Sequence, residues 1–441
     1  MDRIDPQPPS GFRDLLPTDA AARQTMMDRI AGVFRRHGFS SIDTPALERV
    51  DVLTGGETEM SKQMYRARLT ETDEPLGLRF DLTVPLARYV SAHADELTFP
   101  FARYHIGNVW RGEHAQAGRY RQFIQCDADI VGPRSIVADA EIIALVYDVF
   151  RDLGLADKVS IGISNRKVMD GLSDFLTFDA TRTPSVLRAI DKRSRMGWDA
   201  VAAELTAKVG LDGQQVDAIQ EFLDLTADTA EELLDKAHAM LQFSPRSHEG
   251  IEELRQLVAL VDELGVPRSA WSVDLAIARG LGYYTGTVFE TMLTALPTYG
   301  SVCSGGRYDD LVSRFAPLNL SGVGMSVGMD RLFSALDELG LVPPSTASPA
   351  RVAVLDFDAD VRPTVLKTIT DLRTAGVSAM LYLGSDDSLK GQLAWAVKAG
   401  FPYVVIIGAK EQERGVAQLK NLAERTQDEV PLAELAGRLT S

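Results

Sequence analysis

The stretch from Phe101 to Gly132 constrains the fold most, because two strand-like segments follow one another with only a short polar segment between them. Residues 102–110 and 119–131 mix apolar and polar residues and carry aromatic and branched side chains, which is typical of strands. Residues 111–118 are small and polar, which is typical of a loop. The pattern predicts a long antiparallel hairpin.

Charged side chains mark both ends of this hairpin. Arginines cluster at its loop, and acids follow along the return strand. Because strand side chains alternate between faces, one side of the sheet is expected to carry Arg119, Arg121, Gln125, Asp127 and Asp129. A polar face of this kind suits a small zwitterionic ligand held beside a phosphate. The alternative is a solvated face stabilised by ion pairs.

Length and composition set outer limits. The chain has 441 residues, which predicts two or three domains, and its hydrophobic content of 45% is ordinary for a globular protein. No apolar run approaches the roughly 20 residues of a membrane span. Two cysteines far apart favour a reducing, cytoplasmic compartment, and no metal-ligand spacing occurs among the histidines. A net charge of −16 disfavours non-specific nucleic-acid binding but permits a partner held by local basic patches.

The segments before the hairpin read as helix, strand, strand and helix. Apolar residues at helical spacing predict a helix over 20–37, with Asp19 as its cap, and residues 39–47 read as a strand interrupted by Pro45. Residues 76–90 predict a strand ending near Asp81 and then a helix with Pro85 in its first turn. Asp81 and Thr83 then lie at a corner where side chains can point into a site, unless Thr83 only caps the helix.

The segments after the hairpin predict an interrupted core. A helix over 136–153 and a strand over 158–164 precede a largely helical insertion, in which Ile251, Leu254, Val258, Val261 and Leu264 keep helical spacing. Strand character returns at 271–276 and 287–292. Residues 300–309 read as a glycine-rich polar turn, and residues 321–332 as a glycine-rich strand that leads into a helix.

The C-terminal part of the chain has a different pattern of hydrophobic residues. Residues 342–349 have linker composition. Beyond them, three apolar strands (351–357, 377–383 and 403–408) alternate with helical stretches, which predicts a small α/β domain. No Walker loop or dinucleotide fingerprint occurs anywhere in the chain.

Taken in order, five motifs resemble those of class II aminoacyl-tRNA synthetases, and specifically of histidyl-tRNA synthetases. Pro45 with its preceding helix resembles the first class motif, the hairpin 109–129 the second, and residues 324–332 the third. The stretches 279–286 and 304–309 are similar to histidine-specific signatures. Residues 78–85 resemble the eukaryote-like branch of the family.

The resemblance implies an α+β fold: an antiparallel class II catalytic core with a helical insertion and a C-terminal α/β anticodon-binding domain. The expected division is 1–178 for the first part of the core, 179–267 for the insertion, 268–340 for the second part of the core, 341–350 for a linker and 351–441 for the anticodon-binding domain. A homodimer is also implied.

The resemblance implies two-step chemistry with ATP and Mg²⁺. The carboxylate of L-histidine attacks the α-phosphate of ATP, and the terminal ribose of tRNA(His) then attacks the histidyl-adenylate. Both steps need aligned reactants and stabilised charge at phosphorus. Arg111 and Arg279 match the family's catalytic arginines at the α-phosphate, and Arg331 matches one at the γ-phosphate and adenine. The residues expected at ATP are Arg111, Glu113, Arg119, Tyr120 and Arg331.

Histidine selection is implied in the same way. Asp129 and Tyr284 match residues that hold the two imidazole nitrogens, and Asp81, Thr83 and Gln125 match residues at the α-ammonium group. Such a pair rejects apolar side chains, because they would leave buried polar groups unpaired. The full expected histidine set is Asp81, Leu82, Thr83, Arg111, Gln125, Asp129, Arg279, Tyr283 and Tyr284. For Asp129 the alternative is an ion pair with a neighbouring arginine.

Two departures from the family pattern stand out. Gly282 occupies a position where an acidic residue is usual. In the hairpin loop Glu113 is kept, but His114 and Ala115 stand where arginine and proline are usual. That part of the loop faces the tRNA acceptor end in the family, so the departure concerns tRNA recognition and leaves the chemistry of ATP and histidine as expected.

Two other functions compete with the active ligase. One is a catalytically silent paralogue that senses histidine, like the regulatory subunit of ATP phosphoribosyltransferase. Such relatives typically lack a C-terminal domain and lose ATP-contacting arginines, whereas this chain keeps both. The other is a ligase that transfers histidine to a different acceptor, which the departures at His114 and Ala115 leave open.

Overall fold

The computed structural model describes residues 4–55, 63–68, 74–113, 118–277, 283–343 and 350–440. The chain divides into two compact units. One comprises Met1–Arg13 and Met26–Val342, and the other comprises Asp14–Thr25 and Pro343–Ser441. None of the described helices is long and apolar enough to cross a membrane.

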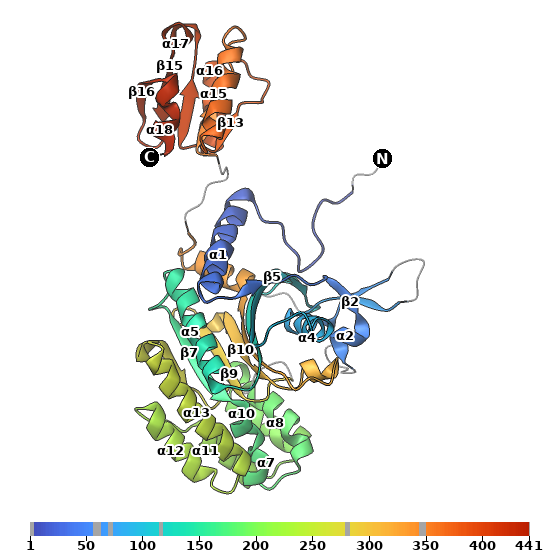
Figure 1. The fold of residues 1–441 in the computed structure, drawn as a ribbon. Helices are drawn as coiled ribbons and strands as arrows, with labels where there is room; N and C mark the ends of the chain where they lie inside the picture. Colours follow the sequence, from blue (N-terminus) through green and yellow to red (C-terminus); the bar gives the residue numbers. More distant parts are fainter. Residues whose placement is uncertain are drawn as a thin grey trace. The chain divides into compact units, whose positions relative to one another are not determined.

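An eight-stranded, mostly antiparallel sheet forms the centre of the first unit (Figure 1). Only the pairs at its two ends, β1 with β5 and β7 with β8, are parallel. In spatial order its strands are β1 (Ser40–Ser41), β5 (Phe101–Trp110), β6 (Gln122–Gly132), β11 (Ser321–Gly328), β10 (Cys303–Tyr308), β9 (Thr287–Leu293), β7 (Val159–Asn165) and β8 (Trp271–Val273).

The predicted hairpin is β5 and β6, paired from Phe101 opposite Val131 to Trp110 opposite Gln122. Gln125, Asp127 and Asp129 alternate along β6 as expected. The return strand begins at Gln122, however, so the prediction that Arg119 and Arg121 share the strand's polar face is wrong. Arg121 instead donates hydrogen bonds to the backbone oxygens of Glu113 and Ser10.

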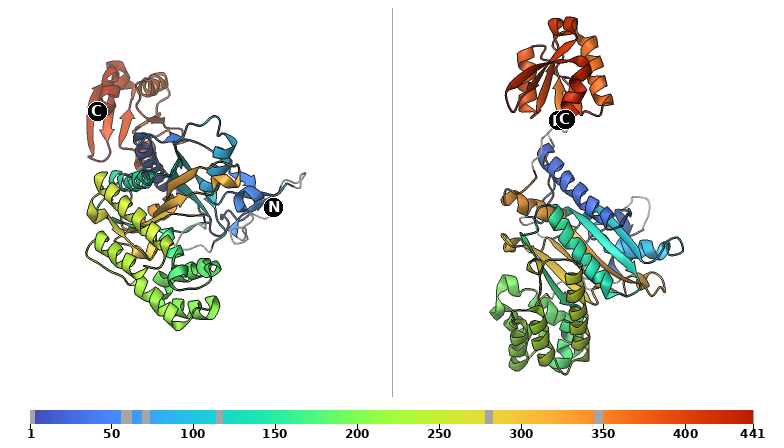
Figure 2. Two further views of the ribbon diagram at one scale, coloured as in Figure 1. Left: turned by 60° about the horizontal axis from the view of Figure 1, so that its bottom comes forward. Right: turned by 60° about the vertical axis from the view of Figure 1, so that its left-hand side comes forward.

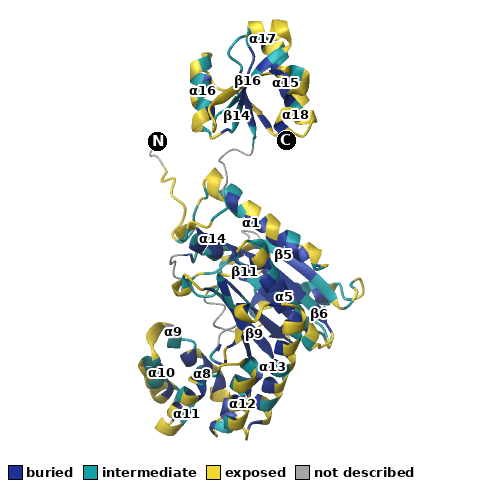
Figure 3. Cartoon of the chain, turned by 90° about the vertical axis from the view of Figure 1, so that its left-hand side faces the viewer, coloured by how far each residue is buried: buried dark blue, intermediate teal, exposed yellow. Residues whose placement is uncertain are grey.

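Within the first unit, the part of one long helix from Met26 onward lies beside a second long helix. Helix α1 (Pro17–Arg36) and helix α5 (Ile136–Asp152) are joined by ion pairs from Arg29 and Arg36 to Asp152 (Figure 1). Figure 3 shows α5 over the buried strands of the large sheet. Because α1 begins at Pro17, Asp19 lies in its first turn and is not the predicted cap.

A smaller three-stranded sheet, in the order β2 (Leu47–Arg49), β4 (Leu76–Leu78) and β3 (Arg66–Ala67), leads into helix α4 (Thr83–Ala92), with helix α2 (Val50–Thr54) beside it. The apolar residues of α2 and α4 share one buried cluster with Tyr308, against which Tyr283 and Tyr284 pack. This cluster brings the start of α4 next to the large sheet.

The insertion is helical, as predicted. Figures 1 and 2 show its helices gathered at one end of the large sheet. Asp212, Thr229 and Ser244 each accept a backbone hydrogen bond at a helix start. Helices α6 (Arg166–Asp170) and α7 (Leu172–Phe175) precede the predicted insertion. Within it the helices are α8 (Thr183–Ile190), α9 (Arg193–Met196), α10 (Trp198–Glu204), α11 (Gly213–Leu223), α12 (Ala230–Met240) and α13 (Pro245–Glu263). The predicted apolar stripe of α13 is buried except for Leu264, which follows the helix end and is exposed.

The stretch predicted as a glycine-rich polar turn, residues 300–309, is mostly a central strand, β10, and this prediction was wrong. Its glycines serve close packing between strands. A Cβ at Gly305 would lie 2.1 Å from the backbone oxygen of Gly324, and one at Gly306 would lie 2.5 Å from that of Thr287. Strand β11 then runs into helix α14 (Met329–Glu338), as predicted.

The C-terminal sheet has the order β13 (Ala379–Leu381), β12 (Val352–Val354), β14 (Tyr403–Ile406), β15 (Val416–Asn421) and β16 (Thr426–Pro431). The first three strands are parallel and the last two pairs are antiparallel, so the sheet is mixed, one of the two arrangements that the α/β pattern allows. The antiparallel strands β15 and β16 were not predicted, because their sequence is polar and β16 is largely exposed. The helices are α15 (Arg362–Thr374), α16 (Leu389–Lys398), α17 (Ala409–Arg414) and α18 (Leu435–Thr440).

Candidate active site

A cleft of about 420 Å³ opens between the hairpin, strands β9 to β11 and the start of α14. It brings together residues that are far apart in the sequence and that were predicted to form the site. They are Asp81, Thr83, Arg111, Glu113, Arg119, Tyr120, Gln125, Tyr283, Tyr284 and Arg331. Leu82 and Asp129 lie buried beside this lining. Arg279, Gly282, His114 and Ala115 lie outside the described residues.

At the deep end of the cleft, Asp81 combines a structural contact with an unused acceptor. Its Oδ1 accepts the backbone N–H of Val84, in the first turn of α4, at 3.0 Å, and Thr83 is the first residue of that helix and not its cap. Its Oδ2 is buried and has no hydrogen-bond partner among the described residues. Burial raises the pKa of this carboxyl, because the charged form is poorly solvated.

Two neighbours on β6 repeat this arrangement. Gln125 donates its Nε2 to the Ser326 hydroxyl at 2.6 Å, while its Oε1 finds no partner among the described residues. Asp127 is 1% exposed, and its Oδ1 is likewise unpartnered there. Burial raises the pKa of Asp127 to about 7, against the opposing effect of Arg103. We name Asp81, Gln125, Asp127 and Asp129 the acceptor floor.

Asp129, the fourth residue of the acceptor floor, already has partners. Its carboxylate lies 2.6 Å from the fully buried guanidinium of Arg103 and accepts the Tyr308 hydroxyl at 2.7 Å. The ion pair considered from the sequence is therefore present. A Cβ at Gly324 would lie 2.0 Å from Asp129 Oδ1, so glycine makes room for this carboxylate. Tyr308 was not predicted as a site residue, although the signature 304–309 contains it.

Three tyrosines stand around the acceptor floor. Tyr283 meets Tyr284 edge to face at 5.1 Å and Tyr308 at 6.0 Å. Burial and the nearby carboxylates raise the pKa of each phenol, so all three remain protonated at neutral pH. The deep end of the cleft thus combines unpaired acceptors with phenols that can donate or accept.

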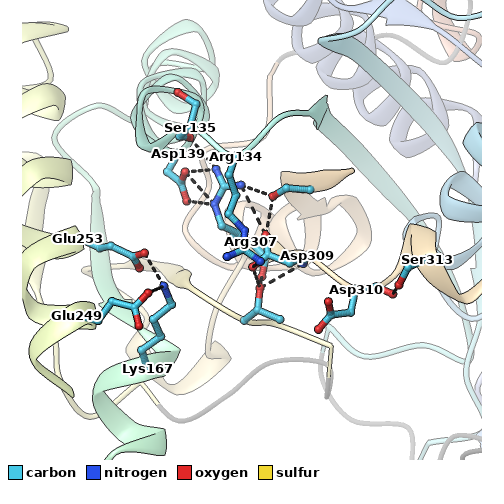
Figure 4. Close-up of polar contacts among 12 residues, drawn as sticks. Arg134, Ser135, Asp139, Lys167, Glu249, Glu253, Arg307, Asp309, Asp310 and Ser313 are labelled. Carbon is cyan, nitrogen blue, oxygen red and sulfur yellow. Dashed lines mark hydrogen bonds and ion pairs between the residues drawn. The ribbon is translucent and has the colours of Figure 1, made fainter. Parts of the chain in front are cut away.

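Figure 4 shows a cluster of ion pairs and hydrogen bonds around Arg307, the residue before Tyr308. Arg307 binds Asp139 and the backbone oxygen of Ser135, and Asp309 binds Thr285 at 2.7 Å. Thr285 follows Tyr284 directly, and its N–H donates to the Arg307 backbone at 2.9 Å. The cluster therefore fixes the corner that carries two tyrosines against the strand that carries the third.

The outer end of the cleft is basic, and its arginines already have partners. Arg111 donates Nε to the Phe80 backbone oxygen at 2.8 Å and lies over the Phe123 ring. Arg331 donates Nη1 to the Ser301 backbone oxygen at 2.7 Å. Arg119 lies 3.7 Å from the Glu113 carboxylate. We name Arg111, Glu113, Arg119, Tyr120 and Arg331 the basic mouth. Phe123 also lines the cleft and was missed, because one aromatic residue in a strand is ordinary core by sequence.

A second cavity of about 940 Å³ adjoins the cleft on the side of the insertion. Arg119, Asp191, Arg195 and Glu290 line both spaces. Outer strands of the large sheet and helices α8 and α9 form its remaining walls. The site is thus open toward the insertion.

This architecture, with an antiparallel sheet whose hairpin and glycine-rich strand enclose a cleft, is that of a class II aminoacyl-tRNA synthetase. Residues 11–332 match the family described as Histidyl-tRNA synthetase, and residues 350–441 match the Anticodon binding domain. A histidine--tRNA ligase of Wolinella succinogenes is 42% identical over 95% of this chain and 94% of its own. One from Rhodopirellula baltica is 40% identical over 97% and 96%. The chain belongs to the histidyl-tRNA synthetase family.

Solved structures agree with this assignment. Histidyl-tRNA synthetase from Nostoc sp. PCC 7120 has a TM-score of 0.87 at 37% identity and covers 99% of both chains. The predicted fold class and the predicted enzyme activity, ligation of histidine to tRNA, are confirmed. An ATP phosphoribosyltransferase regulatory subunit/histidyl-tRNA synthetase from Bacillus halodurans C has a TM-score of 0.74 at 21% identity, which shows a shared fold alone. The silent paralogue is therefore not favoured, and the eukaryote-like branch stays a prediction.

Proposed function

We propose that the acceptor floor binds L-histidine and the basic mouth binds ATP, so that histidyl-adenylate forms where the two ends of the cleft meet. One observation carries this proposal. Asp81 and Gln125, which line the cleft, and Asp127, which lies between Gln125 and Asp129 on β6, each carry a buried acceptor oxygen without a partner among the described residues, and arginines line the other end of the same cleft. Buried acceptors without donors are unfavourable until a ligand supplies them.

The α-ammonium group of histidine supplies those donors. It carries three N–H bonds and a positive charge. Asp81 and Gln125, in the lining of the cleft, accept hydrogen bonds from it, and the buried carboxylate of Asp127 attracts its charge. Thr83 and the backbone at Leu82 complete this end. Raised pKa values at Asp81 and Asp127 fit a site whose countercharge arrives with the substrate.

The imidazole ring lies toward Tyr284 and Asp129, with Tyr283 alongside. Tyr308 joins this set, because its hydroxyl is bonded to the Asp129 carboxylate. An apolar side chain of similar size would leave these groups unpaired, so it is rejected more strongly than by shape alone.

The basic mouth orients the phosphates of ATP. Arg111 contacts the α-phosphate, where its planar guanidinium stabilises the charge that develops during attack by the histidine carboxylate. Arg331 and Arg119 hold the outer phosphates and the base, with Tyr120 and Glu113 beside them. Arg279 belongs to the same proposal as a second cation at the α-phosphate.

Magnesium fits this mouth in a limited way. The described residues contain no cluster of three candidate metal ligands. Mg²⁺ is commonly held by one or two carboxylates together with substrate phosphates. Of the carboxylates that line the cleft, Glu113 and Glu290 would hold it, and the bound ion would neutralise phosphate charge.

The second step, the acceptor and the assembly complete the proposal. The acceptor is tRNA(His), with residues 351–441 as the anticodon-binding domain and the core divided by the insertion at 179–267. A homodimer in the cytoplasm is part of the same proposal. Cys126 and Cys303 are both buried and are not joined by a disulfide, which fits a reducing compartment. Light scattering at micromolar concentration tests the dimer, and a monomer there contradicts it.

Histidine-dependent exchange of pyrophosphate into ATP tests the chemistry, with Arg279→Ala as an inactive control. Absence of exchange with the wild-type protein would overturn the proposed site. Exchange without charging of tRNA(His) would redirect the second step to another acceptor. That outcome would follow from the loop at His114 and Ala115.

A further inference from the structure

The N-terminal segment, which is part of none of the five motifs named above, is bonded to the hairpin. We name Pro9–Arg13 the strap. The backbone oxygen of Gly11 accepts the N–H of Arg121 at 2.8 Å, and the Arg121 guanidinium donates to Ser10 at 3.0 Å. The same guanidinium also donates to the backbone oxygen of Glu113 at 3.2 Å. The strap is therefore bonded to Arg121 on one side of the hairpin loop, and Arg121 is itself bonded to Glu113 on the other side.

Arg13 ends the strap and makes two charged or polar contacts at once. Its Nη2 lies 2.7 Å from Asp330 Oδ1, and its Nη1 donates to the Tyr120 hydroxyl at 2.9 Å. The guanidinium also lies 3.9 Å from the centre of the Tyr120 ring. A planar, delocalised cation suits this combination of ion pair and stacking better than an ammonium group does.

Asp330 connects Arg13 to the basic mouth. Its side chain is almost fully buried, and its Oδ2 accepts the backbone N–H of Ile124 at 2.7 Å. Asp330 thus joins the start of α14 to the return strand of the hairpin. The next residue on α14 is Arg331, which lines the cleft together with Tyr120.

We propose that Arg13 is a positioning residue for ATP: through Asp330 and Tyr120 it fixes the spacing between the hairpin loop and Arg331. The proposal rests on the assignment of ATP to the basic mouth. The acceptor floor makes none of its hydrogen bonds or ion pairs with Arg13 among the described residues. Loss of Arg13 therefore affects ATP and spares histidine.

The test measures both substrates. In pyrophosphate exchange, Arg13→Ala is expected to raise the KM for ATP about tenfold, the size of one lost charge-assisted hydrogen bond, and to change the KM for histidine less than twofold. Arg13→Lys keeps the charge next to Asp330 but loses the planar fork, so it restores part of the loss. Arg188→Ala is the matched control, because the side chain of Arg188 donates to Ser185 on the exposed face of the insertion.

Two further measurements keep the outcome decisive. Calorimetric titration with ATP alone should show that Arg13→Ala weakens ATP binding to the same extent. This measurement tests the proposal even if the protein catalyses no histidine-dependent exchange. In an Asp330→Asn background, Arg13→Ala should add little, because the contact it removes is already weakened. An unchanged KM for ATP, or equal increases for both substrates with a lowered melting temperature, overturns the proposal. If Arg13→Ala does not fold, the same comparison between the KM for ATP and the KM for histidine is made with Arg13→Lys and Asp330→Asn.

Discussion

The two ends of the cleft differ in how far the protein has already bonded its own polar groups. At the basic mouth, Arg111 and Arg331 each donate to a protein oxygen, and the Tyr120 hydroxyl accepts from Arg13. At the acceptor floor, oxygens of Asp81, Gln125 and Asp127 are buried and unpartnered among the described residues. The mouth is arranged before any ligand binds, whereas the floor is complete only when a cationic ligand supplies donors.

This difference separates two kinds of binding. A preorganised set of cations gains its advantage in the transition state, because no reorganisation accompanies the growth of charge at phosphorus. Unpaired buried acceptors instead select a ligand, because a molecule without matching donors leaves them unpaired. Changes at the mouth should therefore lower the rate, and changes at the floor should raise the KM for histidine.

The largest expected effect is at the mouth. Arg111→Ala should lower the rate constant for pyrophosphate exchange by about 10²–10³-fold, the range found when one donor to a developing oxyanion is removed. The KM for histidine should change much less. Arg111→Lys, which keeps the charge and loses the fork, should recover only part of the rate. An increase confined to the KM for histidine would place Arg111 at the floor instead.

A smaller effect is expected at the floor. Asp81→Asn keeps an oxygen that can cap α4 but removes the negative charge at the unpartnered position. The KM for histidine should rise by roughly 10–100-fold, as for a lost hydrogen bond to a charged group, with little change in the KM for ATP. The melting temperature of the free enzyme should not fall, because a poorly solvated carboxylate is removed. A fall in stability with an unchanged KM would show that Asp81 only caps the helix.

Some of the residues in these predictions could be identified from the sequence, and others only from the structure. The alternation of β6 and the order of the motifs were enough to place Gln125 and Asp129 on the hairpin and Arg111 in the cleft. Tyr308 and the strand that carries it could not be found in this way. Glycines 305 and 306 suggest a turn by local preference, and only the neighbouring backbones show that they allow strands to pack closely. Arg13 and Asp330 are 317 positions apart, a contact that no local pattern indicates.

The acceptor floor also predicts a dependence on pH. Burial raises the pKa of Asp127 to about 7, so folding favours its protonated form, and the stability of the free enzyme declines as pH rises through 7. Bound histidine favours the ionised form. The KM for histidine should therefore fall by up to about tenfold between pH 6 and 8. His105, opposite Asp127, stays neutral in this range, because burial and two arginines lower its pKa to about 4.

Asp127→Asn isolates this effect from the titration of histidine itself. The variant should bind histidine more weakly at pH 8 than the wild type does, and the difference between the two proteins should shrink toward pH 6. Titration calorimetry in two buffers of different ionisation enthalpy measures the protons released on binding. A difference that is constant with pH would remove Asp127 from the list of groups that respond to the substrate.

The smallest effect is expected at His37, away from both ends of the cleft. Like the arginines of the basic mouth, His37 already has protein partners, but it contacts no proposed ligand. His37 lies 3.0 Å from Glu141 and 3.1 Å from Asp148, both on α5, and hydrogen bonds to these carboxylates raise its pKa. Its stabilising effect is therefore complete below the ordinary histidine pKa and is lost as pH rises through the raised value. His37→Gln should lower the free energy of unfolding by less than about 1 kcal/mol near pH 5.5, and by less still at pH 8. Arg36→Ala, which breaks a pair between the same two helices, should give a loss that does not vary over this range, measured by denaturant unfolding at each pH. If the two variants showed the same dependence on pH, the titration of His37 would not contribute to stability. Neither variant should alter the KM for ATP or for histidine.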